Sequence, residues 1–95
     1  MSQTPPRLVT SREDVDRLER LILECHDEAM LRITMDDDSV FEGTVSVRPT
    51  VEAFRNAAGD EGHNALLRLD DLEDPAVPHY IWLDGVRSIE RLGTT

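Results

Sequence analysis

MLRITMDDDSVFEGTVSV, residues 30–47, is the stretch that decides the fold. Apolar and polar residues alternate on both sides of its acidic centre, which is typical of half-buried strands. Residues 36–39 are short Asp and Ser side chains, and these favour a turn because they bond to their own backbone. The stretch therefore predicts two strands, over residues 30–35 and 40–48. Their apolar faces are Leu31, Ile33 and Met35 before the turn, and Phe41, Gly43, Val45 and Val47 after it.

Gly43 lies inside the second predicted strand. A glycine at such a position marks a bulge, a sharp bend or a close approach of two backbones. Three more strands are predicted towards the C-terminus, over residues 64–69, 79–83 and 86–92. Asp84-Gly85 separates the last two and is a strong signal for a two-residue hairpin turn.

On the N-terminal side, apolar residues recur at helical spacing between Val15 and Cys25, with charged residues on the opposite face. This pattern predicts one amphipathic helix over residues 11–27. Thr10 and Glu13 form a T-x-x-E capping box, and Ser11 is a competing cap one residue later. Residues 1–9, with two prolines, predict a flexible tail. Residues 49–62 show no period of two, and we expect a long connection with a helical tendency.

The composition limits the class of protein. The chain has 95 residues, which suits a single domain over residues 10–95. It has 20 acidic residues and ten basic ones, all arginine, so the net charge is −10. This charge argues against non-specific binding to phosphate backbones, and we expect no DNA partner. Cys25 is the only cysteine, which favours a reducing compartment. With no secretory signal and no apolar run of ~18 residues, a cytoplasmic protein without membrane contact is expected.

One helix followed by five short antiparallel strands, with a glycine bend in the second, resembles the Sm-like family, which includes bacterial Hfq. The resemblance covers roughly residues 10–92 and rests on two motifs. LRITMDDDSVFEGTVSV is similar to the first Sm motif, and DEGHN at residues 60–64 repeats its D-x-x-x-N spacing. LDGVRSI at residues 83–89 resembles the second. The resemblance implies a mainly β fold, a strongly bent, open five-stranded antiparallel barrel, in a divergent bacterial variant of the family.

The resemblance also implies a nucleotide pocket. In it His63 would stack on a base and Asn64 would bond to a base edge, as in readers of single-stranded RNA. Asp60 and Arg87 are the other RNA-binding candidates. The alternative is structural: Asn64 caps the loop and His63 is a solvent-facing strand entry. Two departures weaken the RNA hypothesis: Gly62 stands where an aromatic or histidine side chain often stacks, and Asp84 where many members carry the arginine that holds uridine.

The strand at residues 79–83 is apolar on both faces. Tyr80 and Trp82 share one face, while Ile81 and Leu83 share the other. Core packing explains one apolar face, so a subunit interface is a fair explanation of the second. We therefore assign Tyr80, Trp82 and Ile81 to an oligomer interface, in a homo-oligomer that is a dimer or a ring.

These patterns favour a non-enzymatic, self-associating assembly module in which RNA binding is weak. The alternative is a functional Hfq-type RNA-binding protein that uses Asn64 and His63. A third hypothesis, a small metal-dependent or hydrolytic protein, has little support because no nucleophile–base arrangement or phosphate-binding glycine loop is present. The spacing of Cys25, His26, His63 and His79 matches no zinc signature. We expect no cofactor, no metal and no catalytic residue.

Overall fold

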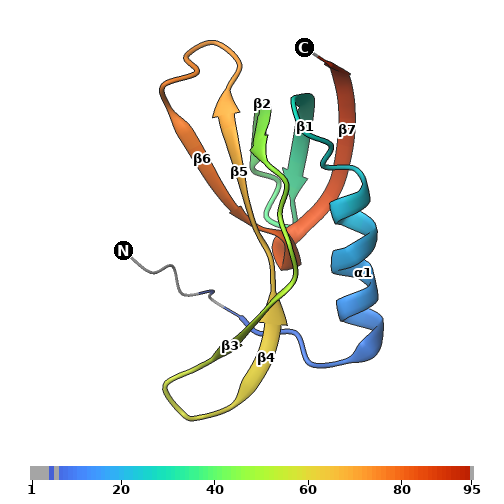
Figure 1. The fold of residues 1–95 in the computed structure, drawn as a ribbon, viewed down its shortest axis with the longest axis vertical. Coiled ribbons are helices and arrows are strands. Elements are labelled where there is room, and N and C mark those ends of the chain that lie inside the picture. The colour runs from blue at the N-terminus through green and yellow to red at the C-terminus, as the bar shows by residue number, and fades with distance from the viewer. Residues whose placement is uncertain (1–4, 6, 95) are drawn as a thin grey trace.

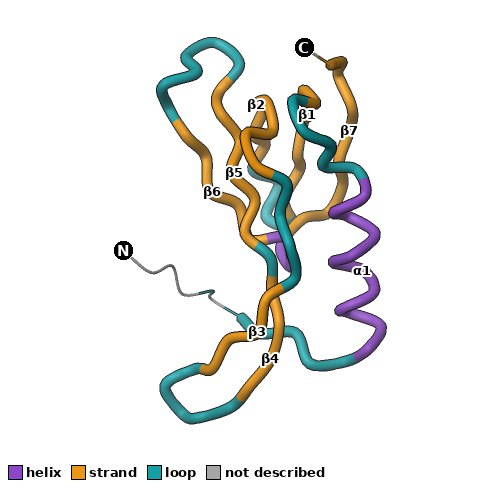
Figure 2. Tube along the Cα trace, viewed as in Figure 1, coloured by secondary structure: helices purple, strands orange, loops and turns teal. Residues whose placement is uncertain are grey.

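The computed structural model describes residue 5 and residues 7–94, and it contains one α-helix and seven strands. Five strands form one antiparallel sheet in the order β6-β5-β2-β1-β7, and β3 pairs with β4 in a separate hairpin. Figure 1 and Figure 2 show this hairpin projecting from one end of the sheet, where β4 leads into β5. The elements are α1 (Arg12–Leu23), β1 (Ala29–Met35), β2 (Val40–Val47), β3 (Glu52–Arg55), β4 (Glu61–Asn64), β5 (Leu66–Asp71), β6 (Pro78–Trp82), the 3₁₀ turn η1 (Leu83–Gly85) and β7 (Val86–Thr94).

The five predicted strands are present, and the sheet that they form is bent and open. β6 pairs with β5 and β7 pairs with β1, so within the described residues the two outer strands do not close into a barrel. Gly43 permits a close approach of β2 to the paired strand β5. A Cβ at this position would lie 2.6 Å from the carbonyl oxygen of Asp70 and 2.9 Å from Cβ of Leu69. Of the three alternatives predicted for Gly43, the structure thus shows a close backbone approach.

The core lies on one face of the strands, as the period of two requires. α1 contributes Leu18 to it and packs against η1 and β4. No helix within the described ranges is long and apolar enough to cross a membrane. The buried apolar residues are Leu18, Cys25, Ala29, Leu31, Ile33, Val45, Ala65, Leu67, Leu69, Ile81, Leu83 and Val86.

The helix differs from its prediction at both ends. Ser11, not Thr10, is the N-cap, and its Oγ accepts a hydrogen bond from the Asp14 N–H at 3.1 Å. The Thr10 capping box was therefore wrong, and the competing cap is the one that forms. α1 ends at Leu23 rather than at residue 27. Beyond it the chain turns, and Glu28 adopts a left-handed φ of 64°, which a continuing helix does not allow.

The helical tendency predicted for residues 49–62 was also wrong. This segment forms the β3–β4 hairpin, in which Glu52 pairs with Asn64 and Arg55 with Glu61. Asn56 organises the turn, because its Oδ1 accepts from the N–H groups of Ala58 and Asp60, both at 3.0 Å. Cross-strand pairing thus overrides the weak local preference of an alanine-containing segment.

Asp84-Gly85 does not form the predicted β-hairpin. η1 instead directs the chain from one edge of the sheet to the other, so β6 and β7 have different partners. Two long-range hydrogen bonds hold this turn: Leu83 N donates to Ala65 O at 2.9 Å, and Asp36 N donates to Gly85 O at 2.8 Å. Burial of Leu83 and these bonds together outweigh the local preference of a D-G pair.

Candidate functional site

Asn64, the residue for which the Sm-like resemblance implies base recognition, is fully buried. Its Nδ2 donates to the carbonyl oxygen of Arg7 at 3.0 Å and to Oδ1 of Asp84 at 2.9 Å. Its Oδ1 accepts from the N–H groups of Ala65 at 2.8 Å and Asp84 at 3.3 Å. Both amide donors and both acceptor positions are therefore occupied by the protein itself. Asn64 thus joins Arg7 near the N-terminus, the end of β4 and η1, and we call this contact of Arg7, Asn64 and Asp84 the junction.

Asp84 is the acidic member of this junction. Its carboxylate is only 4% exposed, and its Oδ2 accepts from Nε of Arg7 at 2.9 Å. The side chain of Arg7 is 66% exposed. The two oxygens of Asp84 are thus divided between Asn64 and Arg7, which supplies the opposite charge that a nearly buried carboxylate requires.

Residues 7–9, which we call the N-terminal segment, lie along β4. Val9 and His63 exchange backbone hydrogen bonds of 2.9 and 2.8 Å in an antiparallel bridge. Gly62 makes this contact possible, because a Cβ there would lie 2.6 Å from Cβ of Leu8. The flexible tail predicted for residues 1–9 lies outside the described residues at positions 1–4 and 6, whereas residues 7–9 contact the hairpin.

His63 is half-buried next to this bridge. Its Nδ1 is buried and has no hydrogen-bond partner among the described residues. The backbone N–H and C=O of His63 both bond to Val9, and on its other side His63 is the register partner of Ala53 in β3. The solvent-facing strand entry proposed as the alternative for His63 therefore describes only part of its environment.

Two cavities adjoin the junction, and both are lined by Arg7, Asp36 and Asp84. The first, of about 380 Å³, also contacts Phe41 and the β6 residues from Tyr80 to Trp82. The second, of about 490 Å³, follows the N-terminal segment towards the start of α1. Further charged lining residues are Asp37 in the first cavity, and Asp14 and Arg17 in the second.

The remaining RNA-binding candidates lie elsewhere. Asp60 belongs to the turn of the β3–β4 hairpin, and its N–H bonds to Asn56. Arg87, at the start of β7, pairs with Asp38 at 2.5 Å. Only His63 and Asn64 are thus neighbours. The residue that sequence reasoning missed is Arg7, because nothing in its local sequence indicates a partner 77 positions away.

The predicted interface residues are divided by the structure. Tyr80 is 51% exposed, whereas Ile81 is part of the core and its side chain is not at the surface. Trp82 packs edge-to-face on Phe54 of β3, with ring centroids 5.7 Å apart. The second apolar face of β6 is therefore covered in part by the β3–β4 hairpin.

Two of the four residues considered as metal ligands, Cys25 and His79, have other contacts. Cys25 is buried, its thiol donates to Leu21 O at 3.4 Å, and burial raises its pKa to about 11. His79 Nε2 lies 2.8 Å from Oδ1 of Asp71, and this hydrogen bond is the main cause that lowers the pKa of Asp71. Over residues 5 and 7–94, no three His, Cys, Asp or Glu side chains are grouped so that they could hold a metal ion.

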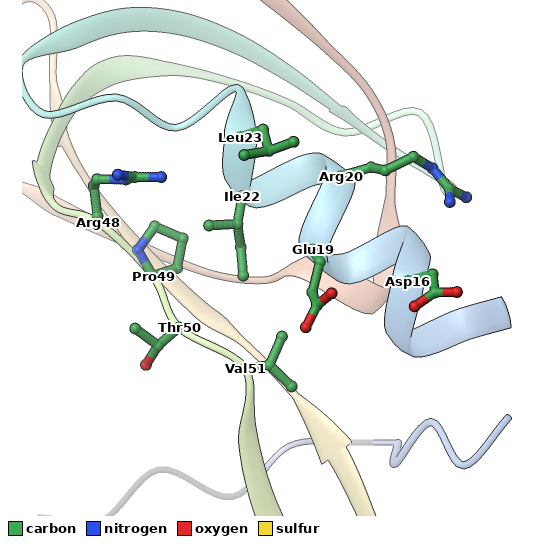
Figure 3. A pocket seen from close by; sticks show the side chains of 9 residues that line it. All are labelled: Asp16, Glu19, Arg20, Ile22, Leu23, Arg48, Pro49, Thr50 and Val51. Atoms are coloured by element: carbon green, nitrogen blue, oxygen red, sulfur yellow. The ribbon is translucent and has the colours of Figure 1, made fainter. Parts of the chain in front are cut away.

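A larger groove of about 870 Å³ separates α1 from the connection between β2 and β3. Figure 3 shows Ile22 of α1 opposite Pro49 and Val51, with Leu23 further along the helix. Asp16, Glu19, Arg20 and Arg48 add charges of both signs at its border. None of the predicted site residues lines this groove.

A helix followed by a bent, open antiparallel sheet, with the close approach of β2 and β5 at Gly43, defines an Sm-like domain. Among solved structures the chain is similar to XC5848 from Xanthomonas campestris, described as adopting a novel variant of the Sm-like motif. The TM-score is 0.85 at 32% identity, over 95% of this chain and 97% of that one.

The predicted resemblance to a divergent Sm-like family is therefore confirmed. The chain belongs to the family described as Domain of unknown function (DUF3247), whose model matches residues 2–92. Comparison with curated proteins finds none that matches.

Proposed function

We propose that this protein is a non-enzymatic Sm-like assembly module that associates with copies of itself through β6 and β7. The observation that carries the proposal is the position of these two strands at opposite edges of the five-stranded sheet. Within the described residues, neither has a strand partner on its outer side. An open strand edge presents unpaired N–H and C=O groups to another chain. Pairing β6 of one copy with β7 of the next would produce a dimer or a ring.

The hydrogen-bond register of β6 supports this proposal. Leu83 N donates to Ala65 O, and residues along an antiparallel pair alternate between bonded and non-bonded positions. Counting back from Leu83, Tyr80 and Trp82 occupy non-bonded positions opposite β5. Their backbone N–H and C=O groups therefore point to the open edge. The half-exposed side chain of Tyr80 adds apolar area there.

Weak RNA binding is the second part of the proposal. It is supported by the hydrogen bonds of Asn64, since a nucleotide would have to replace Arg7 or Asp84 to reach this amide. The net charge of −10 opposes phosphate binding. In the alternative, a functional Hfq-type protein, the N-terminal segment would have to leave and Asp84 would have to tolerate a nearby phosphate.

Sedimentation velocity at micromolar concentration tests the assembly. Wild-type protein should sediment as an oligomer, and Tyr80→Pro should shift it towards monomer because it removes an N–H from the open edge. Tyr80→Ala is the matched control, since it shortens the same side chain and keeps that N–H. A monomeric wild type would overturn the assembly proposal.

Titration with U-rich RNA at physiological salt tests the second part. We expect a Kd no tighter than the ~10⁻⁶ M limit of non-specific contacts. Nanomolar binding would favour the Hfq-type alternative instead.

A further inference from the structure

In the contact between Arg7 and Asp84, the aspartate is nearly buried and the arginine is exposed. Asp84 is held independently of Arg7, because Asn64 Nδ2 donates to its Oδ1 and its own N–H donates to Asn64 Oδ1. Oδ2 of this nearly buried carboxylate is therefore available to a cation. Arg7 reaches it from the N-terminal segment with a side chain that is mostly exposed. The folded body thus provides a preorganised acceptor, and the N-terminal segment provides its present ligand.

The same site recognises the backbone of that segment. Asn64 Nδ2 binds the carbonyl of Arg7, and two residues later Val9 forms an antiparallel bridge with His63. Gly62 leaves the space for Leu8 between these contacts. Together they recognise an extended strand along the outer edge of β4, with one arginine at a defined position. This is the geometry of β-strand addition, in which main-chain bonds provide affinity and side-chain sites provide specificity.

The surroundings favour a basic occupant. The two cavities at the junction share Arg7, Asp36 and Asp84, so space continues on both sides of the bound guanidinium. Asp14 and Asp37 add two more carboxylates to their linings. Apart from Arg7, the one cationic side chain in these linings is Arg17, which donates to the carbonyl of Val86. A partner that carries positive charge would therefore be attracted to this face.

We propose that Asn64, Asp84 and the β4 edge at His63 form a binding site for an extended, arginine-containing peptide of a partner protein. Residues 7–9 occupy this site in cis and compete with that peptide. The site prefers arginine to lysine, because a planar guanidinium can donate from Nε to Oδ2 while its other N–H groups reach the acidic cavities. The hydrogen-bonding groups of this site come from β4 and η1, whereas residues 80–82 of β6 only line one adjoining cavity.

A competition experiment on the full-length chain tests the proposal. The variant Arg7→Ala/Val9→Pro releases the segment, because it removes the guanidinium and the N–H that donates to His63 O. The probe is a fluorescent synthetic peptide with the sequence of residues 4–11, TPPRLVTS, and its binding is followed by anisotropy. We expect the released variant to bind it at least about tenfold more tightly than wild type, as one charge-assisted contact and one backbone bond become available.

Two matched controls address the arginine. A probe in which citrulline replaces arginine has the same shape without the charge, and it should lose about tenfold or more in affinity. Adding Asp84→Asn to the released variant removes the charge on the protein side and should produce a loss of similar size. If the arginine and citrulline probes bind equally, or if neither binds, the proposal is wrong.

Folding and segment exchange are checked separately. Circular dichroism and the fluorescence of Trp82 report whether the released variant keeps its fold. If it does not, Arg7→Ala alone is titrated, and the Asn64 side-chain NH₂ signals in NMR spectra should shift with the arginine probe but not with the citrulline probe. If these signals stay unchanged, or if the wild-type N-terminal segment is found exchanged between two copies, the proposal is overturned.

Discussion

The interior of the five-stranded sheet and the junction of Arg7, Asn64 and Asp84 lie next to each other and are built differently. The first is a layer of apolar side chains such as Leu31, Leu67 and Leu69. The second is a set of hydrogen bonds around one buried amide and one nearly buried carboxylate. Apolar packing is non-directional and scales with area, whereas the junction depends on a few directed contacts.

This difference has a functional consequence. Replacing a strand of the five-stranded sheet would require opening the apolar core. Replacing the N-terminal segment at the junction requires breaking the hydrogen bonds of Arg7 and Val9 and the packing of Leu8 and Val9. The junction is therefore the part of the molecule where an external strand can exchange with an internal one, and the sheet is the rigid support that positions Asn64 and Asp84.

The largest effect should come from the core. Leu67→Ala removes a fully buried side chain and should lower the free energy of unfolding by about 2–5 kcal/mol. Asn64→Ala should cost less, roughly 1–3 kcal/mol, because it removes the partner of the Ala65 N–H, the Asp84 N–H and Asp84 Oδ1 but opens a smaller cavity. Urea denaturation of both variants measures the two values. A larger loss for Asn64→Ala would show that the junction, not the sheet, dominates stability.

Two glycine substitutions separate the regions more finely. Gly43→Ala places a methyl group against the Asp70 carbonyl inside the sheet and should destabilise the protein by about 1–3 kcal/mol. Gly62→Ala places one against Leu8 and should displace the N-terminal segment while the sheet keeps most of its stability. Hydrogen exchange at the Val9 amide should then accelerate in Gly62→Ala alone. Equal acceleration in both variants would mean that the segment and the sheet open as one unit.

The smallest effect concerns the link between the two regions. Ser11 follows the N-terminal segment and caps α1, whose Leu18 enters the core. Ser11→Ala should cost about 1 kcal/mol, because it removes the acceptor of the Asp14 N–H. Thr10→Ala is the matched control and should leave the denaturation midpoint close to that of wild type. The reverse result would restore the capping box at Thr10.

The sequence by itself determined the parts of the fold that have a local signal. The period of two along residues 30–47 predicts burial on one face, and Gly43 predicts an approach of two strands that is too close for a side chain. Both features depend only on residues within one strand or on its paired neighbour, so the pattern and spacing of the sequence are sufficient to predict them. The two Sm motifs also indicated the family. They include residues 60–64 and 83–89, in which Asn64 and Asp84 were singled out.

The tertiary structure alone decided what these two residues do. Arg7 is 57 positions from Asn64 and 77 from Asp84, and no periodic pattern records pairings at such distances. The D-G hairpin preference of Asp84-Gly85 and the helical preference of residues 49–62 are both local, and each gave way to long-range pairing. Local propensities amount to fractions of a kcal/mol per residue, whereas burial of Leu83 and the ladder between β3 and β4 act together, so the tertiary contacts prevail.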